Sequence, residues 1–214
     1  MQNTLNSNQI ILIITRIAHD VEKNIEYLTT LDQAIGDGDH GINLSVGFRA
    51  VLEKIDELKG KDIGTILKTV GQILIAHTGG SAGPLYGTIF IRAGNVAAGR
   101  QEIDMPTLVK MFEAGEQGII EIGEVRLGEK TMLDAFHPAV VALKKAVEEG
   151  KSMEESLAFS AKAAEEGAKS TIELVSKKGR ASYLGNRSLG HQDVGATSTC
   201  LMLKSISESV ATSR

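Results

Sequence analysis

The chain has 214 residues, of which 42% are apolar and 23% charged, so it is long enough to form a globular domain with a sizeable core. Its net charge of −4 leaves no basic footprint for nucleic acid, and the longest apolar run near the start, residues 10–14, is too short for a signal peptide or a membrane span. The single Cys200 excludes an internal disulfide and fits a reducing compartment, so we expect a cytoplasmic protein.

Helical periodicity dominates the chain, and no segment shows the alternation of polar and apolar residues that is typical of a strand. Because most connections between the periodic segments are short, we expect antiparallel neighbours in one all-α domain over residues 1–214, with about eight helices. The predicted helices lie near residues 8–30, 42–58, 62–78, 83–99, 106–122, 131–149, 153–176 and 194–211.

Local signals refine two of these helices. Pro138 lies near the start of the helix 131–149 and is expected to kink this helix or to end its first turn. Ser152 and Glu155 have the spacing of a capping box before the helix 153–176. That helix carries a narrow seam of small apolar residues, which would allow a neighbouring helix to approach closely.

Three aspartates, Asp32, Asp37 and Asp39, lie close together in a glycine-rich stretch between the first two predicted helices. Like charges repel, and both Asp and Gly disfavour a helix interior, so a bound hard cation would explain the cluster. Mg²⁺ prefers oxygen ligands and commonly bridges carboxylates to phosphates. The spacing does not fit a calcium-binding EF-hand, and no pair of Cys or His has zinc-ligand spacing. An ordinary solvated turn is the alternative.

The residues next to the aspartates suit an anion. His40 follows the cluster directly and Asn43 comes three residues later, near a predicted helix start, where backbone N–H groups attract phosphate. A second junction of this kind is His77–Gly87, in which a pair of glycines ends one helix and Ser81 opens the next. Glycine and serine are also common at ordinary helix ends, which is the alternative for this junction.

Two further glycine-rich stretches lead to different predictions. Gly123–Thr131 comes close to the pattern of a phosphate-binding P-loop, but Glu129 separates the glycine from the lysine and the preceding segment is helical in pattern, which argues against a P-loop. Residues 177–195 have no apolar period, and a loop of this length inside a compact domain is usually functional or disordered. A functional role is favoured because the loop contains Arg180, Arg187, His191 and Asp193.

Four motifs taken together resemble the nucleotide-binding subunit of dihydroxyacetone kinases. They are GDGDHG at 36–41, GGSAGPLYGTIF at 79–90, GEKTMLDAFHPA at 128–139 and KGRASYLGNRSLGHQDVGATS at 178–198. The match covers most of the chain in order, and the last motif is long and specific. The resemblance implies an antiparallel barrel of eight helices, with the site in the loops at one end of the barrel.

The same resemblance implies roles for individual residues. Asp32, Asp37 and Asp39 match the Mg²⁺ ligands of the family. No catalytic residue is expected on this chain, because the groups that activate the acceptor hydroxyl would lie on a partner. Val194 stands where some relatives have proline. The residues that match nucleotide contacts are His40, Gly41, Ile42, Asn43, Ser81, Ala82, Gly123, Met132, Arg180, Asp193, Val194 and Gly195.

Members of this family work in two ways. Some are long chains that use ATP and carry their own substrate domain, whereas others are split into separate subunits. Because this sequence leaves no residues for a substrate domain, it resembles the split ADP-binding subunit. A phosphohistidine donor protein of the phosphoenolpyruvate phosphotransferase system would then phosphorylate the bound ADP in place. The phosphoryl group would pass to dihydroxyacetone held by a partner subunit.

Charge counting favours two Mg²⁺ ions beside the nucleotide. The three aspartates contribute about −3 and ADP about −3, so two Mg²⁺ ions would leave about −2 in a partly buried site. Metal ions that bridge phosphates also neutralise the charge that develops during phosphoryl transfer.

Two other functions remain open from the sequence. The chain could be an ATP-dependent kinase module for another small substrate, which free ATP turnover with a different partner would reveal. It could also be a regulator that binds a transcription regulator and reports nucleotide state. The acidic cluster argues against a purely structural role but not against a regulatory one.

Overall fold

The computed structural model describes residues 4–212, and most of these residues are helical. The helices are α1 (Ser7–Lys23), α2 (Ile25–Ile35), α3 (His40–Lys54), α4 (Ile63–His77), α5 (Ala82–Val96), α6 (Met105–Gly123), α7 (Leu133–Glu148), α8 (Met153–Ser170) and α9 (Val194–Thr212). Short 3-10 helices lie at Ile55–Leu58, Thr171–Glu173 and Arg180–Ser188. The described region also contains two short strands, β1 (Thr4–Asn6) and β2 (Glu102–Asp104).

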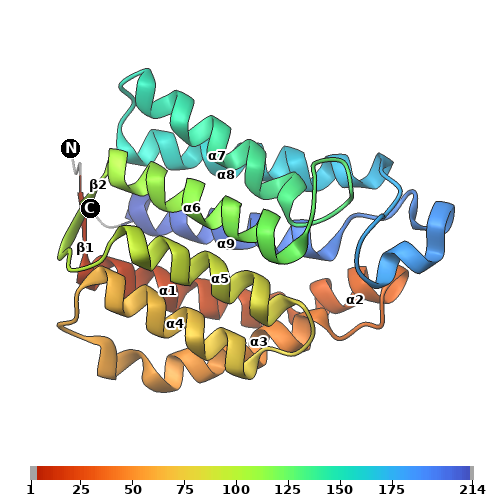
Figure 1. Ribbon diagram of the computed structural model, residues 1–214, viewed down its shortest axis with the longest axis horizontal. Helices are drawn as coiled ribbons and strands as arrows, with labels where there is room; N and C mark the ends of the chain where they lie inside the picture. The colour runs from red at the N-terminus through yellow and green to blue at the C-terminus, as the bar shows by residue number, and fades with distance from the viewer. Residues whose placement is uncertain (1–3, 213–214) are drawn as a thin grey trace.

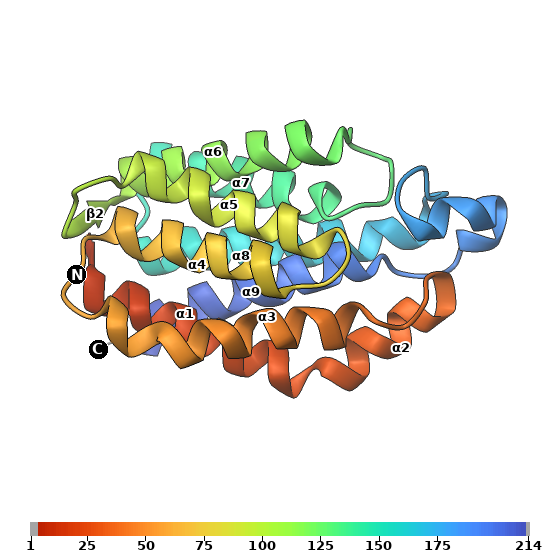
Figure 2. The same cartoon turned by 60° about the horizontal axis from the view of Figure 1, so that its bottom comes forward.

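Eight of the helices form a closed antiparallel ring around an apolar interior (Figures 1 and 2). α1 packs against α3, the helices from α3 to α9 then pack against one another in chain order, and α9 returns to pack against α1. α2 continues from α1 and projects past one end of the ring (Figure 1). The predicted all-α barrel of about eight helices is therefore confirmed.

The prediction of one continuous helix over residues 8–30 is wrong, because the structure has two helices, α1 and α2, separated at Asn24. The backbone of Asn24 leaves the helical conformation (φ −106°, ψ 13°), and its side-chain amide donates to the Asp20 carbonyl at 2.8 Å. Asparagine side chains compete with the helix for backbone hydrogen bonds, which accounts for the break. The second part, α2, runs on to Ile35 and so carries Asp32 to the projecting end of the molecule.

A two-stranded antiparallel sheet lies at the other end of the barrel, although the sequence predicts no strand. β1 pairs with β2, with Leu5 opposite Ile103, and both of these side chains are buried. Strands of three residues are too short to show an alternating pattern, so the prediction of no strand is wrong for this region. The sheet ties the start of α1 to the start of α6 at the end far from α2 (Figure 1).

Helices α7 and α8 approach each other closely at a glycine. A Cβ atom built on Gly167 would lie 2.2 Å from the Asp134 carbonyl oxygen and 2.8 Å from Pro138 Cγ, so no larger residue fits there. Pro138 has no N–H with which to occupy that carbonyl. Pro138 lies in the interior of α7, so the expectation that it ends the first turn of this helix is wrong.

Helix α8 begins where the sequence predicts and ends early. The capping box is present, because Ser152 Oγ accepts from the Glu155 N–H at 3.2 Å and Glu155 Oε2 accepts from the Ser152 N–H at 2.9 Å. The helix ends at Ser170 rather than at residue 176, and a 3-10 turn follows. The Thr171 hydroxyl donates back to the Ala168 carbonyl at 2.6 Å, which satisfies a carbonyl of the last turn.

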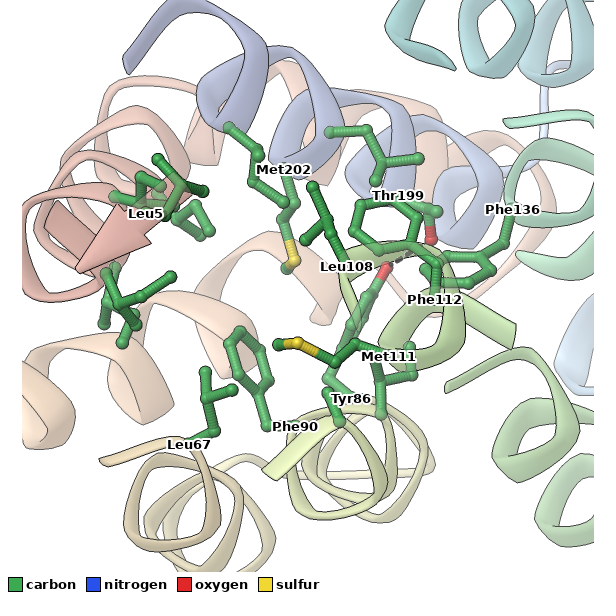
Figure 3. Close-up of a pocket in the computed structure, with 18 residues that line it drawn as sticks. Leu5, Leu67, Tyr86, Phe90, Leu108, Met111, Phe112, Phe136, Thr199 and Met202 are labelled. Atoms are coloured by element: carbon green, nitrogen blue, oxygen red, sulfur yellow. Dashed lines mark hydrogen bonds between the residues drawn. The ribbon is translucent and has the colours of Figure 1, made fainter. Parts of the chain in front are cut away.

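The apolar interior of the barrel is not completely filled. A cavity of about 110 Å³ lies between side chains of β1, α1, α4, α5, α6, α7 and α9 (Figure 3). Tyr86 and Thr199 supply its polar boundary, and their hydroxyl groups lie 3.0 Å apart. Tyr86 also contributes to the wall of the cleft at the projecting end of the barrel, so this residue separates the interior from the cleft.

Candidate functional site

A cleft of about 510 Å³ opens at the end of the barrel where α2 projects. Four connections line it, and we name each by the helices it joins. They are the α2–α3 turn (36–39), the α4–α5 loop (78–81), the α6–α7 loop (124–132) and the α8–α9 segment (171–193). Segments far apart in the sequence therefore share one site, because alternate helices of an antiparallel barrel begin at the same end.

The α2–α3 turn brings the three predicted metal ligands together. Asp32, Asp37 and Asp39 each offer a carboxylate oxygen, and these three atoms lie within 4.8 Å of one another. Asp32 Oδ2 also accepts hydrogen bonds from the N–H groups of Asp39, at 2.9 Å, and of His40, at 3.1 Å. A Cβ atom at Gly36 would lie 2.1 Å from Asp32 Oδ1, so glycine is required for this convergence. Oxygen atoms at this spacing suit a hard divalent cation such as Mg²⁺.

Arg180 reaches the acidic cluster from the other side of the cleft. Its Nη1 lies 2.6 Å from Asp37 Oδ2, and both side chains are partly exposed to solvent. The α8–α9 segment therefore contacts the α2–α3 turn through an ion pair between two residues that the sequence singles out. A guanidinium at this position can also bind the oxygens of a phosphate group.

His40 connects the acidic turn to the barrel through a chain of hydroxyl groups. Its Nε2 lies 2.9 Å from Ser198 Oγ, which lies 2.7 Å from the Tyr86 hydroxyl. Burial lowers the pKa of His40 more than the charges of Asp32 and Asp39 raise it, which favours the neutral imidazole. Burial also raises the pKa of Tyr86 to about 12, which keeps its hydroxyl protonated. The network fixes the position of the imidazole at the start of α3.

The α4–α5 loop supplies a backbone surface next to Asn43. A Cβ atom at Gly79 would lie 2.7 Å from Asn43 Cγ, and Gly80 has a φ of +64°, so both positions favour glycine. Ser81 precedes α5 but its side chain makes no capping hydrogen bond. The first N–H groups of α5 therefore have no side-chain partner, and such groups bind anions readily.

Asp193 is a half-buried carboxylate directly before α9. Its Oδ2 accepts from the Ala196 N–H at 2.7 Å, and its own N–H donates to Thr171 Oγ1 at 2.9 Å. Desolvation of the carboxylate raises its pKa to about 7, although hydrogen bonds from the backbone at Ala196 and Gly195 and the Lys130 ammonium act in the opposite direction. Asp193 thus links α9 to the start of the α8–α9 segment.

The structure brings most of the predicted residues to the cleft. Two do not line it: Gly41 is buried against α2, where a Cβ atom would lie 2.6 Å from the Ile25 carbonyl oxygen, and Ile42 has 52% of its surface exposed on α3. Contact of each residue with a nucleotide stays a prediction. The predicted site residues that do line the cleft are Asp32, Asp37, Asp39, His40, Asn43, Ser81, Ala82, Gly123, Met132, Arg180, Asp193, Val194 and Gly195.

Three residues at this site were not singled out from the sequence. Tyr86 and Ser198 form the network behind His40, and Lys130 is a buried lysine in the cleft wall. A signal for Lys130 was present, since it belongs to the stretch that resembles a P-loop. The pattern could not show its partners, because they lie about 40 to 60 residues further along the chain.

Comparison with known proteins places the chain among kinase subunits. Residues 34–208 match the DAK2 domain family. The ADP-binding subunit DhaL of the PEP-dependent dihydroxyacetone kinase of Escherichia coli K12 is 44% identical over 201 residues, which cover 94% of this chain and 96% of that protein. The ADP-binding subunit DhaL of the PTS-dependent dihydroxyacetone kinase of Lactococcus lactis is 32% identical, over 89% of this chain and 91% of that protein.

The fold also matches a solved structure. The native dihydroxyacetone kinase of C. freundii superimposes with a TM-score of 0.73 at 24% identity, over 98% of this chain. The chain spans about a third (35%) of the length of that enzyme, so the likeness concerns one part of it. Within residues 4–212, no helix is both long and apolar enough to cross a membrane. With the matches over almost the full length of two kinase subunits, these findings show that the chain belongs to the DAK2 domain family.

Proposed function

We propose that this chain is the ADP-binding subunit of a split dihydroxyacetone kinase. ADP held in the cleft is phosphorylated in place by a phosphohistidine donor protein of the phosphoenolpyruvate phosphotransferase system. The resulting ATP passes its phosphoryl group to dihydroxyacetone on a partner subunit. The observation that carries the proposal is the meeting of three carboxylates with the uncapped start of α5 in one cleft.

The donor set fits Mg²⁺ bound to a diphosphate. Asp32, Asp37 and Asp39 present oxygen atoms within 4.8 Å of one another, and glycines at 36 and 79 leave space that a Cβ atom would fill. Three carboxylates and a diphosphate bring a charge of about −6 into the cleft, which two divalent ions reduce to about −2. Asp32, Asp37 and Asp39 would hold Mg²⁺, which would neutralise charge on the oxygens of the transferred group.

The residues of the chain bind and orient the nucleotide. N–H groups at the start of α5 donate to phosphate oxygens, and Asn43 of α3 lies against Gly79 in the loop before α5. Arg180 exchanges its contact with Asp37 for a phosphate oxygen, because carboxylate and phosphate are both bidentate partners of a guanidinium. The hydrogen bond between Nε2 of His40 and Ser198 Oγ holds the imidazole at a fixed orientation beside the acidic turn.

The hydroxyl group that accepts the phosphoryl group is activated by residues outside this chain. The residues that line the cleft are needed to hold an anion and a cation, and no general base for a hydroxyl group is required among them. The groups that bind dihydroxyacetone and take its proton lie on the partner subunit. The open side of the cleft gives both that subunit and the phosphohistidine donor access to the terminal phosphate.

The test is to purify the native protein, identify the bound nucleotide and metal by mass spectrometry, and then add phosphoenolpyruvate with the donor proteins. We expect ADP with two Mg²⁺ ions and its conversion to bound ATP, which is consumed only when the substrate-binding subunit and dihydroxyacetone are added. Multiple turnover with free ATP would support an ATP-dependent kinase module instead. Binding of ADP without any phosphorylation would favour the regulatory alternative.

A further inference from the structure

Lys130 is an almost completely buried lysine in the wall of the cleft, with 1% of its surface exposed. Its Nζ donates to three backbone carbonyl oxygens, those of Thr171 at 2.6 Å, of Leu174 at 3.2 Å and of His191. All three carbonyls belong to the α8–α9 segment, two near its start and one near its end. One side chain of the α6–α7 loop therefore holds both ends of a segment of 23 residues, numbered 171–193.

The hydrogen-bond count requires the charged form of this lysine. An ammonium group has three donors and a neutral amine has two, so only the ammonium can satisfy three carbonyls. Burial lowers the pKa of Lys130, and the neighbouring Asp193 carboxylate opposes that change. A cation is thus retained inside the wall of a site whose opposite side carries three aspartates.

The backbone around Lys130 is shaped for this contact. Lys130 has a φ of +62° and Glu124 a φ of +47°, and within residues 4–212 they are the two non-glycine residues with a positive φ. Such a conformation is unfavourable for residues with a side chain, so the surroundings must hold it. Asp134 does so from α7, since its carboxylate accepts from the N–H groups of Gly128 at 2.6 Å and of Thr131 at 2.8 Å.

A second bond joins the same two segments beside Lys130. The N–H of Lys177 donates to the Glu129 carbonyl at 3.1 Å. The α6–α7 loop leads into Met132, and the α8–α9 segment carries Arg180 and Asp193, all of which line the cleft. The α8–α9 segment otherwise extends past the end of the barrel beside α2 (Figures 1 and 2).

We propose that Lys130 is a positioning residue for the bound nucleotide. Lys130 joins the α6–α7 loop to the α8–α9 segment and so fixes these two walls of the cleft relative to each other. Arg180 and Asp193 are therefore held in place before the nucleotide binds. A preorganised site binds more tightly because less ordering is left for the binding step. This inference rests on the proposed nucleotide-binding function.

The experiment compares Lys130→Met, which keeps the length of the side chain without its donors, with the matched control Lys110→Met on the exposed face of α6. Hydrogen exchange measured by mass spectrometry reports the order of each segment, and calorimetric titration with ADP in excess Mg²⁺ reports affinity. For Lys130→Met we expect at least tenfold faster exchange in residues 124–132 and 171–193, unchanged exchange in α4 and α5, and at least tenfold weaker ADP binding. Bound ADP should restore much of the protection.

Each outcome separates the positioning role from a simpler one. Wild-type ADP affinity in Lys130→Met would overturn the inference, because the lysine would then have no effect on binding. Faster exchange over the whole barrel would also overturn it, because the lysine would then contribute only to global stability. If Lys130→Met does not fold, Lys130→Gln retains two donors and should show the same local changes to a smaller degree. If the wild-type protein itself binds no ADP, the proposed function fails, whereas an effect of Lys130→Met on exchange alone would leave that function standing and reject the positioning role.

Discussion

The two ends of the barrel differ in how the first N–H groups of their helices are bonded. At the end closed by β1 and β2, the helices α1, α4, α6 and α8 each begin with a side chain that accepts a backbone N–H, from Asn6, Asp62, Asp104 and Ser152. At the cleft end the pattern is mixed, because Asp193 caps α9, Thr131 Oγ1 accepts from the first N–H of α7 and Asp32 accepts from the first N–H of α3. Helix α5 begins there without a side-chain cap. A cap stabilises a protein by about 1 kcal/mol, so the closed end uses its helix starts for stability.

The cleft end keeps the first N–H groups of α5 available to a ligand. It also gathers three carboxylates within 4.8 Å of one another, and their mutual repulsion opposes this arrangement when no cation is bound. The contrast teaches that the two functions of the barrel, stability and binding, lie at opposite ends of the same helices. Substitutions at each end should therefore change one property and leave the other as it is.

The largest effect is expected for Asp37→Ala at the cleft end. This side chain is exposed, and it belongs to the carboxylate cluster and pairs with Arg180 at the surface. We expect ADP affinity in Mg²⁺ to fall by at least about 100-fold, while the melting temperature stays the same or rises because repulsion among the aspartates is relieved. Titration calorimetry and a circular dichroism melt measure the two quantities, and ADP retained at wild-type affinity would contradict the metal-ligand role.

The second prediction concerns how long ADP stays bound. At nanomolar affinity and an association rate of about 10⁶ M⁻¹s⁻¹, release takes roughly a quarter of an hour, against about 0.1 s for a typical enzyme turnover. Protein loaded with labelled ADP is mixed with excess unlabelled ADP, with and without EDTA. We expect slow loss of label in Mg²⁺ and loss within seconds after chelation. Escape within seconds in Mg²⁺ would point to an ordinary ATP-dependent module.

Arg180→Ala should slow phosphoryl transfer by about 100-fold with little effect on stability. The guanidinium is largely exposed and its ion pair with Asp37 is at the surface, so it contributes little to folding. Its loss would remove a positive group from the oxygens of the transferred phosphate. Rapid-mixing measurements with the partner subunits present give the rate, and Arg187→Ala in the same segment is the matched control. If Arg180→Ala transfers the phosphoryl group as fast as Arg187→Ala does, Arg180 has no role in transfer and is a solvated surface residue.

The smallest effect is expected at the closed end, for Asp62→Ala. Asp62 accepts from the N–H groups of Thr65 and Gly99, and hydrogen bonding, chiefly from the Thr65 hydroxyl, lowers its pKa from 3.8 to about 2. Because the pKa is lowered in the folded protein, the stabilisation is complete above about pH 4 and is lost as the pH falls through about 2. The variant should lose about 1 kcal/mol of unfolding free energy at pH 7, and less than that near pH 2.

Denaturant titrations at several pH values test this last prediction. ADP affinity should be unchanged in Asp62→Ala, since the residue lies at the end of α4 far from the cleft. A variant that binds ADP more weakly at pH 7 while folded would show that the two ends are coupled, contrary to the division between them.

The fold and much of the site could be predicted from the sequence because helical period and motif order are local signals. The capping box at Ser152 and the grouping of the aspartates are of this kind. The break at Asn24 and the strand pair at Leu5 were missed, since one depends on a single side-chain bond and the other on pairing across about 100 residues. The partners of Lys130 depend on tertiary structure in the same way.

The closure of the ring by α1 and α9 has a consequence for how the molecule is made. The Ser205 hydroxyl of α9 donates to Asp20 of α1 at 2.8 Å, so the last helix of the chain completes the barrel against the first. α9 also begins with two residues of the cleft wall, Val194 and Gly195. A growing chain on the ribosome therefore has neither a sealed core nor a complete site until α9 has emerged, and contacts over such long sequence separations form late. On the proposed function, ADP would then stabilise only a barrel in which α9 has docked, and so would favour finished molecules.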